Sequence, residues 1–200
     1  MGNLTRLSAA SLASIVLDKK FLLEFHSRRN LYIPFGGKFK FDPSVRSFLE
    51  SIGAQDFGEE GDLAFKIPES SLPTFEKWFY TRKGRETDPY TELVEEMVDI
   101  LHLFKDLPRE AVSQMDLIGN FTEGTHFPGR EYPKNLSTKR YLEVFDVGFK
   151  EPYASHLINL SKSPDPKVSL VTRKEILSEK ADDGRRISDH SRYVIPNIGI

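Results

Sequence analysis

The sequence predicts a mixed α/β (α+β) fold, arranged either as α+β or as a three-layer α/β/α sandwich. Three observations support this: strand-like segments outnumber helical ones, the two kinds are interspersed along the chain, and there are enough apolar residues for one core. The 200 residues are 38% hydrophobic and include 15 Phe, which excludes wholesale disorder. We therefore expect a single domain over residues 1–200.

The composition excludes several classes of function. A net charge of −2 gives no global attraction to nucleic acid, so no direct nucleic-acid binding is expected. The absence of cysteine excludes disulfides, thiolate metal sites and a cysteine nucleophile, and is compatible with a cytoplasmic location. No window approaches the roughly 18 apolar residues of a membrane span, and the start lacks a signal-peptide pattern, so no membrane association is expected.

The first part of the chain predicts strands. Residues 11–27 contain two apolar runs separated by Asp-Lys-Lys, which is the pattern of a β-hairpin. A short strand over 31–33 leads into a Pro-Phe-Gly-Gly bend, where Gly36 and Gly37 permit positive φ and a close approach of the backbone. Such a bend either binds a ligand phosphate or only turns the chain.

Residues 43–84 predict a compact module of helix, strand and helix. Phe75, Trp78 and Phe79 share one face of its second helix. We expect this aromatic stripe to lie in the core rather than against a flat ligand ring.

The segment TELVEEMVDI predicts an amphipathic helix. Asp88 is suited to cap its N-terminus and Pro89 to occupy its first position. Four apolar residues recur at helical spacing and predict its buried face. They are Leu93, Met97, Ile100 and Leu101.

Three carboxylates of this helix fall on a separate face. Glu92, Glu95 and Glu96 are spaced i, i+3 and i+4, so their side chains are expected to converge on one patch. The patch is either a solvated acidic surface or a site for a divalent cation, because Mg²⁺ prefers hard oxygen ligands.

The rest of the chain predicts further strands around a long connection. A helical piece is expected at Arg109–Met115, a long polar loop at 120–138 and a strand at 139–149. A strand over 168–171 then leads into a helix capped by Thr172.

The acidic segment resembles the core of the Nudix box, which reads Arg-Glu-hydrophobic-x-Glu-Glu on a metal-binding helix. The order of a hairpin, a glycine bend, an acidic helix and later strands is also similar to the Nudix family. The combination looks like the bacterial SMODS-associated Nudix domains, which are encoded beside synthases of cyclic-oligonucleotide signals in antiphage systems. The resemblance implies a Nudix-type α/β/α sandwich in which 43–84 is inserted within the box.

The chain departs from the box at several places. The insertion separates Gly37 from Glu92, Thr91 stands in place of the box arginine, and Val98 stands in place of the box glycine. These departures bear on whether the box is active.

The resemblance assigns roles to particular residues. Glu92, Glu95 and Glu96 match the ligands of Mg²⁺ (or Mn²⁺) and form the catalytic set. Glu86 is the residue nearest to the box's upstream glutamate, or else a surface charge. Three glutamates outside the box are candidates for a general base. They are Glu123, Glu131 and Glu175.

Several other residues are candidates for contacts with a nucleoside diphosphate. The phosphate-binding candidates are Arg28, Arg29, Gly36, Gly37, Lys38 and Arg85, chosen for their cationic or backbone donors. Arg85 is the one placed to substitute for the missing box arginine. The candidates for stacking on a base are Tyr32, Phe127 and Tyr132, each with core packing or loop anchoring as the alternative, and His126 is a candidate for proton transfer.

The function implied by the resemblance is Mg²⁺-dependent hydrolysis of a pyrophosphate linkage in a nucleoside diphosphate derivative. An ADP-ribose-like compound or a nucleotide signal is the expected substrate, a cyclic-oligonucleotide synthase is the expected functional partner, and a homodimer is compatible with the family. The alternatives are a Nudix-fold sensor that binds a nucleotide second messenger without turnover, and an interaction domain with an acidic patch.

Overall fold

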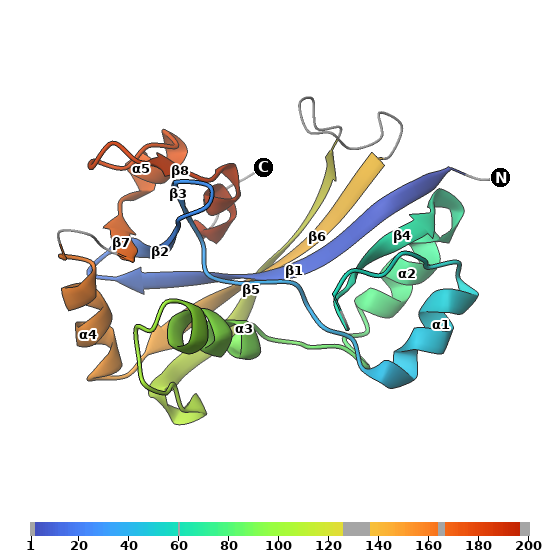
Figure 1. Cartoon of the computed structure of the whole chain (residues 1–200), viewed down its shortest axis with the longest axis horizontal. Helices are drawn as coiled ribbons and strands as arrows, with labels where there is room; N and C mark the ends of the chain where they lie inside the picture. The colour runs from blue at the N-terminus through green and yellow to red at the C-terminus, as the bar shows by residue number, and fades with distance from the viewer. Residues whose placement is uncertain (1–2, 60, 126–136, 164–166, 197–200) are drawn as a thin grey trace. The chain divides into compact units, whose positions relative to one another are not determined.

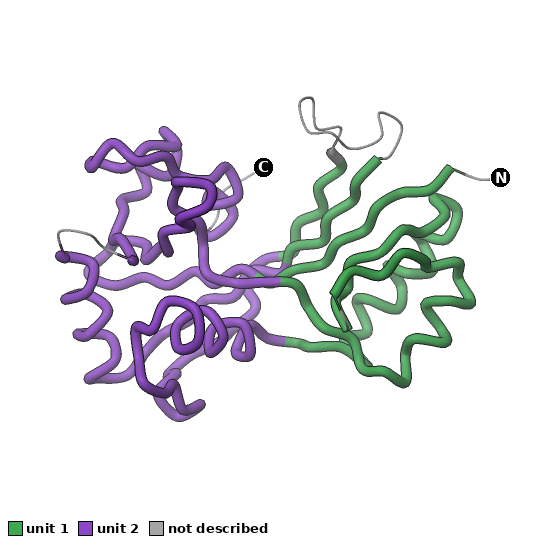
Figure 2. Tube along the Cα trace, viewed as in Figure 1, with its two compact units in different colours: residues 1–11, 38–87, 120–142 green, residues 12–37, 88–119, 143–200 purple. Residues whose placement is uncertain are grey.

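The structure is a computed structural model that describes residues 3–59, 61–125, 137–163 and 167–196 (Figure 1). Figure 2 shows its two compact units: Met1–Ser11, Lys38–Thr87 and Asn120–Leu142 form unit 1, and Leu12–Gly37, Asp88–Gly119 and Glu143–Ile200 form unit 2. The strands are β1 (Leu4–Leu17), β2 (Lys20–His26), β3 (Leu31–Ile33), β4 (Ala64–Pro68), β5 (Val112–Thr125), β6 (Ser137–Phe149), β7 (Val168–Val171) and β8 (Arg186–Ile187). The helices are α1 (Arg46–Ser51), α2 (Leu72–Phe79), α3 (Tyr90–Val94), α4 (Tyr153–Leu160) and α5 (Arg173–Leu177).

The strands form a mixed sheet. Its hydrogen-bonded order is β5-β6-β1-β2-β3-β8, while β4 pairs with β1 and β7 pairs with β2. Strand β3 runs parallel to β8, whereas β2 is antiparallel to β1, β3 and β7. A mixed sheet combined with helices confirms the predicted fold class. None of the helices that the structure describes has the length and apolar character needed to cross a membrane.

The hairpin predicted near the N-terminus is present in unit 2. Val16 pairs with Phe21 across a turn in which Asp18 and Lys19 have φ angles of 48° and 62°. Strand β2 is covered on both faces, since successive side chains point to opposite faces and four in a row, from Phe21 to Glu24, are buried. A glutamate within such a strand is unusual, because an ionised carboxylate loses its hydration there.

The helix–strand–helix order predicted for 43–84 is found as α1, β4 and α2 in unit 1. Strand β4 is antiparallel to the start of β1, with Leu4 opposite Pro68. Phe75 and Phe79 of α2 are buried and stack with ring centroids 5.6 Å apart. Tyr141 of β6 packs against Phe75 at 5.3 Å, so the aromatic stripe belongs to the core, as predicted.

Removal of the Phe75 ring is expected to destabilise the protein strongly. Phe75 is 0% exposed and its ring contacts those of Phe65, Trp78, Phe79 and Tyr141. Phe75→Ala is therefore expected to lower the free energy of unfolding by about 3–5 kcal/mol, measured by urea denaturation. The exposed Lys77 of the same helix is the matched control. A loss for Phe75→Ala no larger than that for Lys77→Ala would contradict this packing.

Two sequence predictions on β5 and β6 are wrong. The helical piece expected at Arg109–Met115 is a 3₁₀ turn, Arg109–Ala111, and β5 begins directly after it. The polar loop expected at 120–138 is strand as far as Thr125, and β6 begins at Ser137. A polar segment forms a strand here because its backbone pairs with β6. From Asn120 to Gly124 the side chains of β5 alternate between exposed and partly covered positions, so polar residues can face solvent.

Candidate acidic site

The acidic helix meets the glycine bend within unit 2. The backbone N–H of Gly36 donates a hydrogen bond of 2.8 Å to Oε2 of Glu96. A Cβ atom added to Gly37 would lie 1.8 Å from Oε2 of Glu92. The carboxylates of Glu92 and Glu96 therefore both lie against the bend. A side chain at position 37 would displace the carboxylate of Glu92.

Local contacts of α3 orient this face of the helix. Asp88 accepts a hydrogen bond from the backbone N–H of Tyr90 at 3.0 Å, and Arg109 donates two hydrogen bonds to the carboxylate of Asp88. Leu93 and Met97 are fully buried, as the spacing predicts. With one face anchored in the core, Glu92 and Glu96 are turned together toward the bend.

The helix changes its winding after α3. Glu95–Ile100 form a single π-helical turn, in which the N–H of Leu101 bonds to the carbonyl of Glu96. The wider turn rotates later residues away from the face predicted for an α-helix. This explains why Ile100, predicted to be buried, is 60% exposed.

Glu95 points elsewhere. It is exposed and lines a shallow surface hollow with Tyr90, Asp99 and Ile100. The structure thus brings two of the three glutamates of the helix to the bend, while the charge of the third still acts on Glu96.

Glu24 of β2 is a further buried carboxylate, and its charge acts on Glu96. It is 7% exposed, and burial raises the pKa of its carboxyl from 4.5 to about 7. Burial also raises the pKa of Glu96, and the negative charge of Glu24 adds to that effect, while the N–H of Gly36 opposes it. The signal available in the sequence was a lone carboxylate inside the apolar run Phe-Leu-Leu-Glu-Phe.

The carboxylate oxygens of this site are of the type that binds a divalent cation, but they are not arranged in the geometry of a metal site. Within the described ranges, no group of three or more His, Asp or Glu side chains is arranged to hold a metal ion. Carboxylate oxygens are nevertheless the ligands that Mg²⁺ prefers, and buried carboxylates need a proton or a cation to offset their lost hydration. Glu92 and Glu96, which both lie at the glycine bend, are the residues that would hold the ion.

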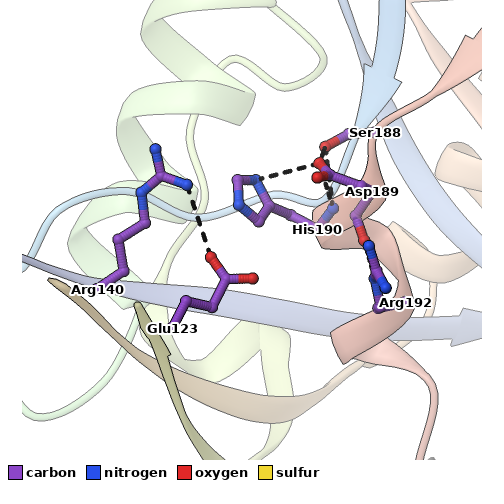
Figure 3. Close-up of polar contacts among 6 residues, drawn as sticks. All are labelled: Glu123, Arg140, Ser188, Asp189, His190 and Arg192. Atoms are coloured by element: carbon purple, nitrogen blue, oxygen red, sulfur yellow. Dashed lines mark hydrogen bonds and ion pairs between the residues drawn. The ribbon is translucent and has the colours of Figure 1, made fainter. Parts of the chain in front are cut away.

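The candidates for a general base lie in different surroundings. Glu123 forms an ion pair with Arg140 of 3.6 Å in unit 1 (Figure 3). In unit 2, Glu175 accepts hydrogen bonds from Thr172 on one oxygen and from the N–H of Asp182 on the other, and these hydrogen bonds lower the pKa of its carboxyl against the effect of burial. This is the capping function of a helix start, which leaves Glu175 poorly suited to accept a proton. Glu131 lies outside the described residues.

Several phosphate-binding candidates are engaged in contacts within the chain. Lys38 forms an ion pair of 2.7 Å with Asp62. Arg85 is buried, with its guanidinium 3.9 Å from the ring centroid of Phe79, and it donates to the carbonyl of Phe79. Arg85 therefore has a packing role within unit 1.

The other candidates are placed as follows. Glu86 accepts a hydrogen bond of 2.8 Å from the N–H of Lys40. Arg28 and Arg29 are exposed in the turn between β2 and β3. Tyr32 is 0% exposed and its hydroxyl donates to Asp183, so its ring belongs to the core rather than to a stacking site. His126, Phe127 and Tyr132 lie outside the described residues.

The paired acids predict an unusual pH dependence of stability. The folded-state pKa of Glu24, about 7, lies above its value of 4.5 in water, so between these values the folded protein binds more protons than the unfolded chain. The stabilisation is present below pH 4.5 and is lost as the pH rises through 7. The free energy of unfolding of the metal-free protein is expected to fall by about 3 kcal/mol from this group, and Glu96 adds to the fall.

Urea denaturation between about pH 5 and pH 8, in the presence of a chelator, measures this fall. Glu24→Gln removes one titrating group and is expected to make the dependence shallower. A free energy of unfolding that stays constant or increases over this range would contradict the assignment.

Comparison with known proteins places the chain in a described family. The family described as the SMODS-associated NUDIX domain matches residues 4–195. No curated protein and no solved structure matches the chain.

Proposed function

Because this chain belongs to the SMODS-associated NUDIX domain family, we propose that it is a Mg²⁺-dependent hydrolase that cleaves a pyrophosphate linkage in a nucleoside diphosphate derivative. The observation that carries the proposal is the placement of Glu92 and Glu96 on the bend formed by Gly36 and Gly37. Glu92 and Glu96 are four residues apart on a helix, so their carboxylates lie on the same side of it. Two neighbouring carboxylates can bind the same cation.

Each residue has a part in the proposed reaction. When bound, Mg²⁺ supplies Lewis acidity at the phosphorus and lowers the pKa of the attacking water. Glu96, held by the N–H of Gly36, is assigned as a ligand of the ion. Glu92 is assigned to accept the proton of the water as it attacks phosphorus, and the bond to the bridging oxygen breaks to release a phosphorylated product.

The substrate class, an ADP-ribose-like compound or a nucleotide signal, and the antiphage context are extensions of family membership. A cyclic-oligonucleotide synthase as functional partner belongs to the same extension. The substrate, the antiphage context and the partner do not depend on the geometry of the acidic site. The hydrolytic reaction does, and it has its own test.

The test is a panel of nucleoside diphosphate derivatives incubated with the full chain and Mg²⁺ in water labelled with heavy oxygen. Mass spectrometry of the products is expected to show cleavage of at least one compound, with the label in one phosphate product. The position of the label identifies the phosphorus attacked. Absence of cleavage across the panel with both Mg²⁺ and Mn²⁺ would overturn the proposal.

A sensor without turnover is the second candidate. Thr91 in place of the box arginine and the open arrangement of the acidic side chains favour it. Calorimetric binding of a panel compound that is recovered intact would support the sensor over the hydrolase.

A further inference from the structure

Strand β5 lies at one end of the sheet, and among the described residues its one strand neighbour is β6. The first part of β5, residues 112–119, belongs to unit 2 and is mostly exposed. The neighbouring side chains of β6 from Glu143 to Phe145 are, by contrast, all buried. A strand with a neighbour on one side leaves the backbone N–H and C=O groups of its outer edge available to a further strand.

Two large apolar side chains on this edge strand are exposed. Leu117 is 39% exposed and Ile118 is 43% exposed. Because consecutive side chains of a strand point to opposite faces, β5 presents apolar surface on both faces of the sheet. A helix packed on one face would cover one of the two side chains, whereas a strand added beside β5 contacts both.

The edge lacks the features that normally prevent strand pairing. Exposed edges are usually interrupted by Lys, Pro or a bulge, or are very short. Residues 112–119 read VSQMDLIG, in which Asp116 is the one charged residue and there is no proline. Strand β8, at the other end of the sheet, is two residues long and one of them is Arg186. The edge at β5 is therefore suited to pairing, while the edge at β8 is protected.

The segment is complementary to a second copy of itself. A two-fold axis pairs two copies of a strand antiparallel, so the residue on the axis lies opposite its own copy. With Leu117 or Ile118 on the axis, an apolar side chain packs against itself and no two carboxylates are opposed. With Asp116 on the axis, two like charges would be opposed, which is destabilising. A strongly charged partner would find only Asp116 to pair with, so the charge of the segment favours the second copy.

We propose that the chain forms a homodimer in which residues 112–119 of β5 pair antiparallel with the same segment of a second copy. The two-fold axis passes at Leu117 or Ile118, and one continuous sheet then runs through both copies. The pairing is independent of the proposed hydrolysis, because Glu92, Glu96 and the glycine bend lie outside β5.

The first experiment measures the oligomeric state of the full chain by analytical ultracentrifugation over a range of micromolar concentrations. The natural chain is expected to be a dimer. Leu117→Lys introduces a charge on the edge in both copies and is expected to raise the Kd of the dimer by at least about tenfold. Because Leu117 is already partly exposed, the melting temperature of the dissociated variant is expected to stay close to that of the natural chain.

The matched control is Leu177→Lys, which makes the same change at a leucine of α5 that is 57% exposed. It is expected to leave the Kd of the dimer unchanged. A natural chain that is monomeric throughout the concentration range overturns the proposal. Equal values of Kd for Leu117→Lys and Leu177→Lys overturn it as well.

The second experiment uses the absence of cysteine from the chain. Leu117→Cys and Ile118→Cys each introduce a single thiol. Opposite residues of an antiparallel pair have Cα atoms about 4.5–5.5 Å apart, which is within the range of a disulfide. Mild oxidation is therefore expected to cross-link the variant whose cysteine lies on the two-fold axis, seen as a dimer on a non-reducing gel.

Leu177→Cys is the control for the second experiment and is expected to remain a monomer on the gel. These cysteine substitutions are small, so they test the pairing even if Leu117→Lys fails to fold. Cross-linking of neither β5 variant overturns the proposal, and so does cross-linking of Leu177→Cys to the same extent.

Discussion

Glu96→Gln is expected to lower kcat/KM for Mg²⁺-dependent hydrolysis by about a thousandfold while the fold is retained. The amide oxygen of glutamine can still accept the hydrogen bond that Gly36 donates to Glu96. The contact between helix and bend is therefore kept, and the change isolates the loss of negative charge. The measurement is kcat/KM at saturating Mg²⁺ on the compound that the natural chain cleaves fastest.

The control for this experiment is Asp99→Asn, which removes a carboxylate from an exposed position of the same segment. It changes net charge by the same amount, so it corrects for any general electrostatic effect on an anionic substrate. If Glu96→Gln retained the activity of Asp99→Asn, Glu96 would have no part in the chemistry.

Gly37→Ala is expected to reduce kcat/KM by about a hundredfold through displacement of a neighbouring side chain. The new Cβ would lie 1.8 Å from Oε2 and 2.4 Å from Cδ of Glu92, so this carboxylate has to leave its position. Gly37 is not among the glycines with positive φ, and its backbone therefore accommodates alanine without strain. We expect the melting temperature to change little while catalysis and Mn²⁺ affinity both fall.

Gly124→Ala is the matched control, because no heavy atom lies within 4 Å of its added Cβ. Both substitutions add one methyl group and remove the same backbone freedom from the unfolded chain. Equal activities of the Gly37→Ala and Gly124→Ala proteins would show that the position of Glu92 over the bend has no functional consequence.

The features that could be predicted from sequence are those determined by local patterns. The hairpin around Asp18 and Lys19, the order of α1, β4 and α2, and the helix start at Thr172 each depend on residues close together in the chain. Thr172 and Glu175 form a capping box, in which each side chain binds the backbone of the other. Helical i, i+4 spacing, which is also a local pattern, identified Glu92 and Glu96 as neighbours.

The features that were missed depend on contacts between distant segments. Strand β5 contains polar residues that give no apolar alternation, and its pairing with β6 decides its structure. The prediction that Ile100 is buried was wrong, because it assumed the period of an α-helix and the residue lies in a π-helical turn. Arg85 was predicted to bind phosphate, and Glu24 was not predicted to have a role. Both residues are buried, which only the fold shows.

The most direct test of the account is a crystal structure of the natural chain grown with Mn²⁺, with an anomalous difference map to locate the ion. A peak is expected in contact with carboxylate oxygens of Glu92 and Glu96 beside the bend at Gly36 and Gly37. A peak elsewhere, with these two carboxylates unoccupied by metal at saturating Mn²⁺, would contradict it.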